Sequence, residues 1–229
     1  VTRTSGPGEV TINLDAVRLP VGAFPGTDME RAYDAFLTLY DEALPAVDAL
    51  DAALTNSNVG VNATPTLINA CAIACGEFEF NVHRHCVPER TLKVVLAVDD
   101  ERIRIREALG YGEPHFSQEE YYRTGPETGE HFYGANSRDA LTAADTFSED
   151  PPSLDDRYVH EDVRIAGVLQ SSLGATFGVD TPTLDSLMHL ADVLMDESYR
   201  ETGRNLTRLG IDADDPKQVQ AVLERGFEA

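Results

Sequence analysis

Apolar residues recur at spacings of three and four in the last third of the chain, a period typical of helices that bury one face. Over residues 163–177 this pattern predicts one helix, and Gly178 should end it because glycine readily adopts a positive φ. A second helix is predicted to begin at Thr181-Pro182, with the threonine as N-cap and the proline in the first turn. Its buried stripe is expected to comprise Leu184, Leu187, Met188, Ala191, Leu194 and Met195.

Similar start and stop signals predict helices elsewhere in the chain. One helix is expected from Thr64-Pro65 to Gly76, another from Pro88 to about Leu109, and a last one after Asp215-Pro216. Val10 to Leu19 alternates in part and predicts one or two strands, and a helix follows at Thr27. The fold is therefore predicted to be mainly α, a bundle of about six or seven helices after a short α/β segment.

The charge balance limits the partners of the protein. The 229 residues carry a formal net charge of −22, and of the 18 basic residues only Lys93 and Lys217 are lysines. Such an acidic surface keeps a protein soluble in concentrated salt, which indicates a halophilic cytoplasm. The sequence has no basic patch for nucleic acid or an anionic membrane surface. Its longest aliphatic run, Val94 to Val98, is far too short to span a bilayer.

A cation and several carboxylates gather where the helix over residues 163–177 begins. Arg157-Tyr158 is followed by Glu161-Asp162, at a junction that offers free backbone N–H groups and the positive end of the helix dipole. Here Arg157 could bind a substrate carboxylate in a forked geometry, and Asp162 could hold a substrate ammonium or orient a histidine. An intramolecular Arg–Asp pair together with an N-cap is the structural alternative.

The residues around this junction resemble the helical C-terminal domain of the octopine/nopaline (opine) dehydrogenase family, a domain of the 6-phosphogluconate-dehydrogenase type. The matching residues are Leu154-Asp155, Arg157-Tyr158, Glu161-Asp162-Val163, Gly178-Val179, Thr181-Pro182, Asp185, Leu187, Tyr199-Arg200, Gly203-Arg204 and Leu209-Gly210. The resemblance implies an enzyme that reductively condenses a 2-oxo acid with the amino group of an amino acid, using NAD or NADP. It also implies that Arg157 and Asp162 are active-site residues.

The same resemblance extends to residues 56–70, with two departures, one of which is Val59 in place of a proline of the family. Asn58 and Leu67-Ile68-Asn69-Ala70 match, but the catalytic histidine of the family falls at Asn62. An asparagine can hydrogen-bond a substrate but cannot deliver a proton, and losing acid–base assistance typically costs about 10²–10⁴-fold in rate. We therefore expect Asn62 to hydrogen-bond the substrate, with Asn58 as a further substrate-binding residue.

Other histidines are candidates for the missing proton donor. His160 lies two residues before Asp162 and is the nearest candidate in the sequence, while His83 and His85 follow the helix that Thr64 begins. His160 is also predicted to contact the substrate. For each histidine, a place at the surface or at the edge of the core is the structural alternative.

Cysteines close to these histidines raise the question of a metal site. Cys71 and Cys75 are one helical turn apart, and Cys86 directly follows His85. Structural zinc needs four ligands in a closed tetrahedron, and this spacing matches none of its usual patterns. Because Cys71 and Cys75 fall on the apolar face of a predicted helix, where cysteine behaves as a small hydrophobe, no metal site is predicted.

The first part of the chain resembles the end of the dinucleotide-binding domain of the same family. We therefore expect residues 1–60 to be a remnant of a Rossmann domain and residues 61–229 to form an α-helical substrate and dimerisation domain. The sequence has no Gly-x-Gly-x-x-Gly turn for a pyrophosphate, and Gly6-Pro7-Gly8 does not replace it. The NAD or NADP site is therefore expected on a nucleotide domain that this sequence does not contain, from a longer gene or another polypeptide.

Two functions stay open at this point. The first is an opine-dehydrogenase-like oxidoreductase that acts on a small 2-oxo acid and an amino acid, as a homodimer or together with a separate nucleotide-binding chain. The second is a non-catalytic helical binding or oligomerisation module that has lost both the nucleotide half and the catalytic histidine. Oxidation of NADH or NADPH that depends on both substrates would distinguish the two.

Overall fold

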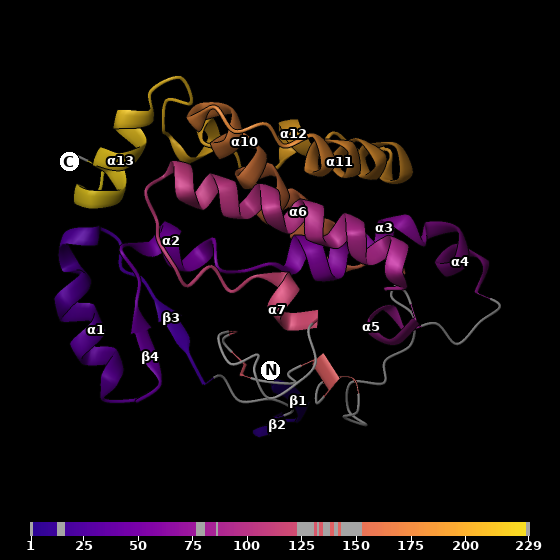
Figure 1. Ribbon diagram of the computed structural model, residues 1–229, viewed down its shortest axis with the longest axis horizontal. Coiled ribbons are helices and arrows are strands. Elements are labelled where there is room, and N and C mark those ends of the chain that lie inside the picture. The colour runs from indigo at the N-terminus through magenta and orange to yellow at the C-terminus, as the bar shows by residue number, and fades with distance from the viewer. Residues whose placement is uncertain are drawn as a thin grey trace.

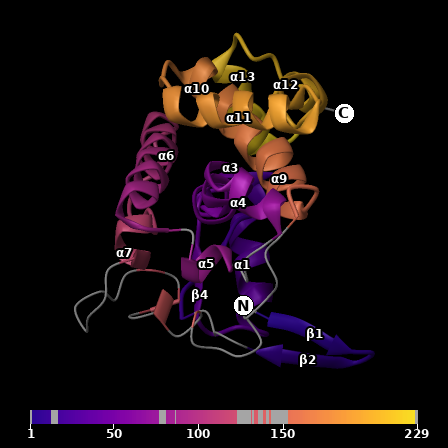
Figure 2. The same cartoon turned by 90° about the vertical axis from the view of Figure 1, so that its right-hand side faces the viewer.

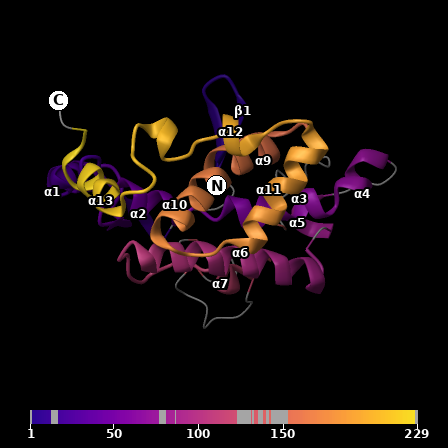
Figure 3. The same cartoon turned by 90° about the horizontal axis from the view of Figure 1, so that it is seen from above.

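The computed structural model describes residues 2–12, 17–76, 81–85, 87–122, 131, 133–134, 138–139, 142 and 153–227. Within these ranges the chain is mainly helical, as predicted, with a small α/β part at its N-terminal end (Figure 1). The longest helix is α6 (Glu89–Ala108), and α10 (Val168–Phe177) and α11 (Pro182–Met195) pack across it (Figure 3). Among the helices in the described ranges, none combines the length and the apolar character that crossing a bilayer requires.

A parallel β–α–β unit forms the α/β part. Strands β3 (Leu19–Val21) and β4 (Ala43–Pro45) pair in parallel, with Leu19 opposite Ala43. The connection between them contains the 3-10 turn η1 (Gly26–Asp28) and the helix α1 (Met29–Leu37). This unit confirms the prediction of a short α/β segment in front of the helical part.

Strands β1 (Thr2–Gly6) and β2 (Glu9–Ile12) form a separate antiparallel hairpin. The hairpin reaches away from the helices (Figure 2), and Val10 and Ile12 stay exposed on it. The stretch from Val10 to Leu19, predicted to hold one or two strands, contains most of β2 and the start of β3. Its residues 13–16 lie outside the described residues.

Shorter elements connect the long helices. They are α2 (Ala49–Ala53), η2 (Val59–Ala63), α3 (Thr64–Ile68), α4 (Ala70–Cys75), α5 (Val82–His85), α7 (Gln118–Tyr122), α9 (Arg157–His160), η4 (Asp162–Gly167), α12 (Tyr199–Thr202), η5 (Thr207–Leu209) and α13 (Pro216–Arg225). Several predicted ends are confirmed, because Gly76 and Gly178 follow helices with φ values of 62° and 71°. The predicted starts at Pro182 and Pro216 are confirmed too, and the Asp215 side chain accepts hydrogen bonds from two first-turn N–H groups of α13.

The helix predicted from Thr64 to Gly76 is in fact two short helices, α3 and α4, that meet at Asn69. The expectation that Cys71 and Cys75 lie on a buried stripe is therefore wrong, and both thiols are exposed. The reason is that α4 turns a different face, which carries Ile73, towards the rest of the protein. A periodic pattern alone did not locate this break.

Two wide helical turns, η2 and η4, interrupt the regular α-helix geometry. The N–H of Thr64 bonds to the carbonyl of Val59 in η2, and the N–H of Val168 bonds to the carbonyl of Val163 in η4, so both turns are of the π type. Pro65, the second residue of α3, has no N–H, which removes one α-helical hydrogen bond at this place. Turns of this kind occur frequently at functional sites.

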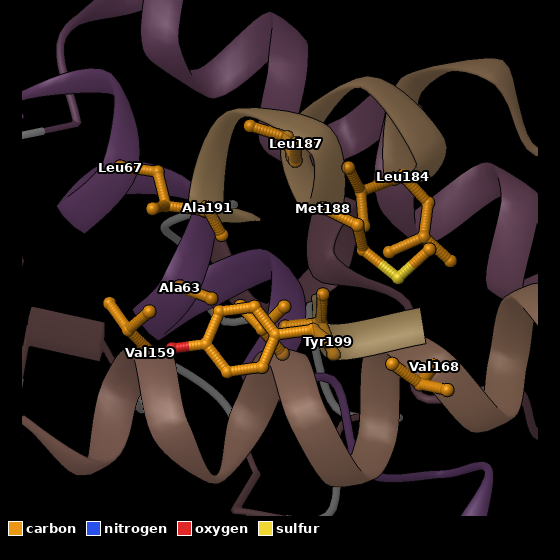
Figure 4. Close-up of a cluster of buried hydrophobic side chains, with 12 residues drawn as sticks. Ala63, Leu67, Val159, Val168, Leu184, Leu187, Met188, Ala191 and Tyr199 are labelled. Atoms are coloured by element: carbon orange, nitrogen blue, oxygen red, sulfur yellow. The ribbon is translucent and has the colours of Figure 1, made fainter. Parts of the chain in front are cut away.

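The main hydrophobic core lies between η2, η4, α3, α6 and α11 (Figure 4). Tyr199 is fully buried in it, and Leu187, Met188 and Ala191 confirm the predicted stripe of α11. The prediction that Leu194 belongs to this stripe is wrong, because its side chain is exposed. The remaining buried members are Val59, Ala63, Leu67, Val98, Val159, Val163, Val168 and Leu184. This core holds the two π-type turns side by side, which matters for the residues they carry.

Helix α11 is capped by a side chain from another helix. Both carboxylate oxygens of Glu101 on α6 accept hydrogen bonds from the N–H groups of Thr183 and Leu184, at 2.8 and 2.9 Å. Helix starts leave such donors without intrahelical partners, and a carboxylate there also meets the positive end of the helix dipole. Glu101 is nearly fully buried, so this cap joins α6 to α11 away from solvent.

Replacing Glu101 with glutamine is expected to lower the free energy of unfolding by about 1–2 kcal/mol, the range of a lost cap. The amide keeps one acceptor oxygen but loses the charge and the second acceptor. Urea unfolding followed by circular dichroism measures the loss. Glu107→Gln on the exposed part of the same helix is the control, and equal losses in the two variants would contradict the capping role.

Candidate functional site

The two π-type turns bring Asn62 and Asp162 into contact. The Asn62 side-chain amide donates a hydrogen bond of 3.0 Å to a carboxylate oxygen of Asp162, across 100 positions of sequence. Asn62 is 7% exposed, and Val59, Ala63 and Val163 anchor both turns in the core on either side of the contact. Two of the residues predicted from the sequence to act together therefore do meet in the fold.

Helix α9 places Arg157 and Tyr158 beside this contact. The helix begins at Asp156, whose carboxylate caps it by accepting a hydrogen bond from the N–H of Tyr158. Arg157 is exposed, and its guanidinium carbon lies 5.4 Å from the centre of the Tyr158 ring. Its positive charge also acts on Asp162, so Arg157 is both accessible to a solute and close to the carboxylate.

The carboxyl of Asp162 has an unusual affinity for protons. Burial raises its pKa from 3.8 to about 6, while hydrogen bonds from Asn62 and Asn58 and the charge of Arg157 oppose this rise. The neighbouring charge of Glu161 adds to it. Asp162 is therefore ionised at neutral pH but held at a cost in folding free energy, which a bound cation would relieve.

Because of this shift, we expect Asp162→Asn to be more stable than the parent protein at pH 8 but not at pH 4. Between about pH 4 and pH 6 the folded parent binds more protons than the unfolded chain, so its stability falls as the pH rises through this window. Asparagine does not titrate, and the stability difference between variant and parent should shift by on the order of 2 kcal/mol between the two pH values.

Urea unfolding of both proteins at each pH, in the same salt, measures this difference. Asp139→Asn, at an exposed position, should behave like the parent protein at both pH values. A variant that is destabilised by the same amount at pH 4 and pH 8 would contradict the burial cost assigned to Asp162.

His83 joins the same group of residues from α5. Its Nε2 lies 3.3 Å from the hydroxyl of Tyr158, and the two rings are nearly perpendicular. Burial, together with the charges of Arg138 and Arg157, lowers the pKa of His83 to about 4, so its imidazole is neutral near pH 7. Sequence reasoning named His83 as a candidate proton donor but did not foresee its contact with Tyr158.

The other candidate histidines make different contacts. The Nε2 of His160 lies 2.7 Å from a carboxylate oxygen of Asp155, and its Nδ1 lies 3.2 Å from the hydroxyl of Tyr199. The Nδ1 of His85 accepts a hydrogen bond from the N–H of Asn81 at the start of α5. His160 is thus engaged with a different pair of residues from those that surround Asp162.

Within the described residues, His, Cys, Asp and Glu side chains form no group of three or more with the geometry of a metal site. Cys86, the remaining member of the cysteine and histidine group considered from the sequence, lies outside these residues.

Taken together, the site offers an accessible guanidinium, a carboxylate between two amides, and a phenol next to an imidazole. A guanidinium suits a carboxylate ligand, and a partly buried carboxylate suits an ammonium group. The arrangement therefore fits a small molecule, or a pair of molecules, that carries both groups. Tyr158 was present in the motif read from the sequence, but its only local signal was its position next to Arg157.

Comparison with known proteins bears on the same region. Residues 45–195 match the α-helical domain of NAD/NADP octopine/nopaline dehydrogenases. The chain is 26% identical over 224 residues to an opine dehydrogenase of Arthrobacter sp. (strain 1C), which covers 97% of this chain and 60% of that protein. It is 29% identical over 132 residues to protein ocs of Agrobacterium vitis, and 28% identical over 147 residues to protein ocs of Agrobacterium tumefaciens (strain Ach5).

These matches cover only part of the related proteins. The two ocs alignments include 56% and 62% of this chain but 35% and 38% of those proteins. The chain thus spans about 60% of the length of the Arthrobacter relative and less of the other two. The matched residues 45–195 contain Asn58, Asn62, His83, Arg157 and Asp162.

Proposed function

This chain belongs to the octopine/nopaline dehydrogenase family, and from that premise we propose that it forms the substrate-binding helical part of an opine-dehydrogenase-like oxidoreductase. The proposed reaction is the NAD(P)H-dependent reductive condensation of a 2-oxo acid with an amino acid. The observation that carries this proposal is the hydrogen bond between Asn62 and Asp162 beside the exposed Arg157. If Arg157 and Asp162 only neutralised one another, the guanidinium of Arg157, and not the amide of Asn62, would bind the Asp162 carboxylate.

Each of these residues has a role that its chemistry supports. Arg157 binds the carboxylate of the 2-oxo acid, because its guanidinium is accessible and fits a carboxylate in a forked geometry. Asp162 holds the ammonium group of the amino acid, which relieves the cost of its buried charge. Asn62 hydrogen-bonds the carbonyl oxygen of the 2-oxo acid once the substrate displaces part of its contact with Asp162. Asn58 keeps its hydrogen bond to the carboxylate of Asp162. His160 has no role in this proposal, since its ring binds Asp155 and Tyr199.

The cofactor belongs to another part of the enzyme. NAD or NADP, when bound, supplies the hydride of such a reduction. The turn after β3 does not fit its pyrophosphate, because a Cβ on Gly22 would collide with the backbone carbonyl of Asp48, so the turn is filled by protein. The β3–α1–β4 unit is typical of the edge of a dinucleotide-binding domain, and we propose that the cofactor is held by residues outside the described ones.

Ligand binding tests the proposal directly. Titration calorimetry with pyruvate as the 2-oxo acid and arginine as the amino acid is expected to show binding, and Arg157→Leu should weaken pyruvate binding by about 1.5–3 kcal/mol, the value of a charge-assisted hydrogen bond. Arg31→Leu, on the exposed face of α1, is the control. Turnover is then measured as NADH or NADPH oxidation after the nucleotide-binding half is supplied in the same or a second polypeptide. If neither pyruvate nor arginine binds under any of these conditions, the proposal is overturned.

One observation favours a second function, a non-catalytic oligomerisation module. Leu190, Val193 and Leu194 of α11 are exposed, with 67% of Val193 accessible, and apolar side chains in such a row are typical of protein interfaces. In that case the protein would form a dimer without turnover, and Arg157→Leu would leave ligand binding unchanged. Sedimentation of the parent and of Val193→Asp tests the dimer, and the effect of Arg157→Leu on ligand binding separates this function from the first.

A further inference from the structure

The pair formed by Tyr158 and His83 lies next to the proposed substrate residues. Helices α9 and α5, which carry the two residues, both pack against η2, the turn that carries Asn62. The hydroxyl of Tyr158 and the Nε2 of His83 are 3.3 Å apart, and their ring centroids are 6.0 Å apart. Their sequence positions differ by 75, so the fold and not a local pattern creates the pair.

Arg157 connects this pair to the substrate residues. Its guanidinium stands over the ring of Tyr158, and its positive charge lowers the pKa of Tyr158, His83 and Asp162 alike. A single charge that acts on three groups places them in one neighbourhood. If Arg157 holds the carboxylate of a 2-oxo acid, the adjacent carbonyl oxygen comes within the same neighbourhood as the phenol.

The proposed reaction needs a proton-transfer group, and Asn62 is not one. When an amine condenses with a carbonyl, the nitrogen must lose protons and the oxygen must gain them before water can leave. An amide side chain neither gives nor takes a proton near neutral pH. The group that replaces it must reach the carbonyl oxygen and must carry a proton that it can donate.

We infer that Tyr158 is the proton-transfer residue of this enzyme and that His83 is its positioning residue. This inference rests on the proposed function. With its proton on Nε2, His83 donates a hydrogen bond to the oxygen of Tyr158, which leaves the hydroxyl proton of Tyr158 free to point at the substrate.

In this arrangement Tyr158 can move every proton between nitrogen and oxygen that the condensation requires. The ammonium group first gives one proton to the carboxylate of Asp162. The amine nitrogen then forms a bond to C2 of the 2-oxo acid, the π electron pair of the carbonyl moves to its oxygen, and Tyr158 gives that oxygen its proton. Tyr158 then takes a proton from the newly bonded nitrogen. A second transfer of the same kind protonates the hydroxyl, the C–O bond breaks, the nitrogen lone pair forms the C=N bond, and water leaves.

The surrounding charges support this exchange. Burial is the main cause that raises the pKa of Tyr158, with Asp156 and Asp162 adding to it, so the hydroxyl is protonated when substrate binds. The charge of Arg157 and its hydrogen bond oppose that rise and stabilise the phenolate that forms during the step. Burial and the charges of Arg138 and Arg157 keep His83 neutral, with one N–H to donate.

Steady-state kinetics of the enzyme with its nucleotide-binding half supplied test the inference. Tyr158→Phe keeps the ring but removes the proton, and it is expected to lower kcat by about 10²–10³-fold, within the range of lost acid–base assistance, with KM little changed. The basic limb of the kcat profile against pH should disappear as well. Tyr33→Phe removes the hydroxyl of a half-buried tyrosine on α1, and it should leave both measurements unchanged.

The positioning role of His83 has its own comparison. His83→Gln keeps an N–H donor and should retain most of the kcat that His83→Leu loses. A Tyr158→Phe variant that matches the parent in kcat and in pH profile would overturn the inference while leaving the proposed function in place. A parent enzyme without any turnover would overturn both. Thermal unfolding of every variant checks that a loss of rate does not come from a loss of fold.

Discussion

Replacing Arg102 with methionine is expected to lower the free energy of unfolding by about 3–5 kcal/mol, the cost of breaking a buried ion pair from one side. Arg102 is 2% exposed, and its Nε donates to Asp99 at 2.8 Å. Its terminal nitrogens donate to the carbonyls of Leu54 and His115, which fastens two connecting segments to α6. Methionine fills similar space but leaves the Asp99 charge and these carbonyls without the guanidinium.

A neighbour on the same helix serves as the control for this prediction. Arg104 pairs with Asp100 at 3.0 Å, but 41% of its side chain is exposed. Arg104→Met should therefore cost no more than about 1 kcal/mol. Urea unfolding of parent and variants in one buffer gives both numbers, and similar small losses in the two variants would show that the buried guanidinium does not hold the segments.

The buried charges of α6 also show where a sequence pattern stops being informative. Its boundaries were predicted well, because Pro88 and Gly110 are local signals whose effect does not depend on the rest of the fold. The burial of Asp99, Glu101 and Arg102 was not predicted. Charged residues at helical spacing normally indicate a solvated face. Burial is favourable here because Arg102 and Glu101 also have partners far away in sequence, namely Leu54, Thr183 and Leu184.

The π-type turns are a second feature that periodicity cannot reveal. Residues 163–177 were predicted as one helix, since a wide turn of five or six residues changes the apolar spacing very little. Asn62 and Asp162, the proposed substrate residues, lie on η2 and η4. The family resemblance assigned both residues to one site, but it did not predict their hydrogen bond, and no local rule connects positions 100 residues apart.

Neither hydrophobic periodicity nor the family resemblance predicted the pair of His83 and Tyr158. The sequence offered three candidate histidines and ranked His160 first because it is close to Asp162 along the chain. In the fold, His160 is bound to Asp155 and Tyr199, whereas His83 reaches Tyr158 from a separate helix. Proximity in sequence did not indicate which histidine contacts Tyr158, since side chains two positions apart on a helix do not face the same way.

Asn62→His is expected to raise kcat of the enzyme, supplied with its nucleotide-binding half, by up to about 10²-fold. A histidine at this position would donate one ring N–H to Asp162, as the amide of Asn62 does now, and would present its other nitrogen to the substrate. The site is only 7% exposed, so the larger ring should cost about 1–3 kcal/mol of stability. Urea unfolding and steady-state kinetics measure the two effects.

The same variant then separates a chemical role of Tyr158 from a structural one. If Tyr158 transfers the proton in the parent enzyme, a histidine at position 62 takes over that task, and Tyr158→Phe should cost far less kcat in the Asn62→His background than in the parent. If neither position takes part in proton transfer, Asn62→His and Tyr158→Phe should instead change kcat by independent factors. Equal losses of kcat in both backgrounds would therefore contradict proton transfer by Tyr158, whatever the size of either loss. The coupling between positions 62 and 158 is the more decisive measurement, because it compares the same Tyr158→Phe change in two backgrounds.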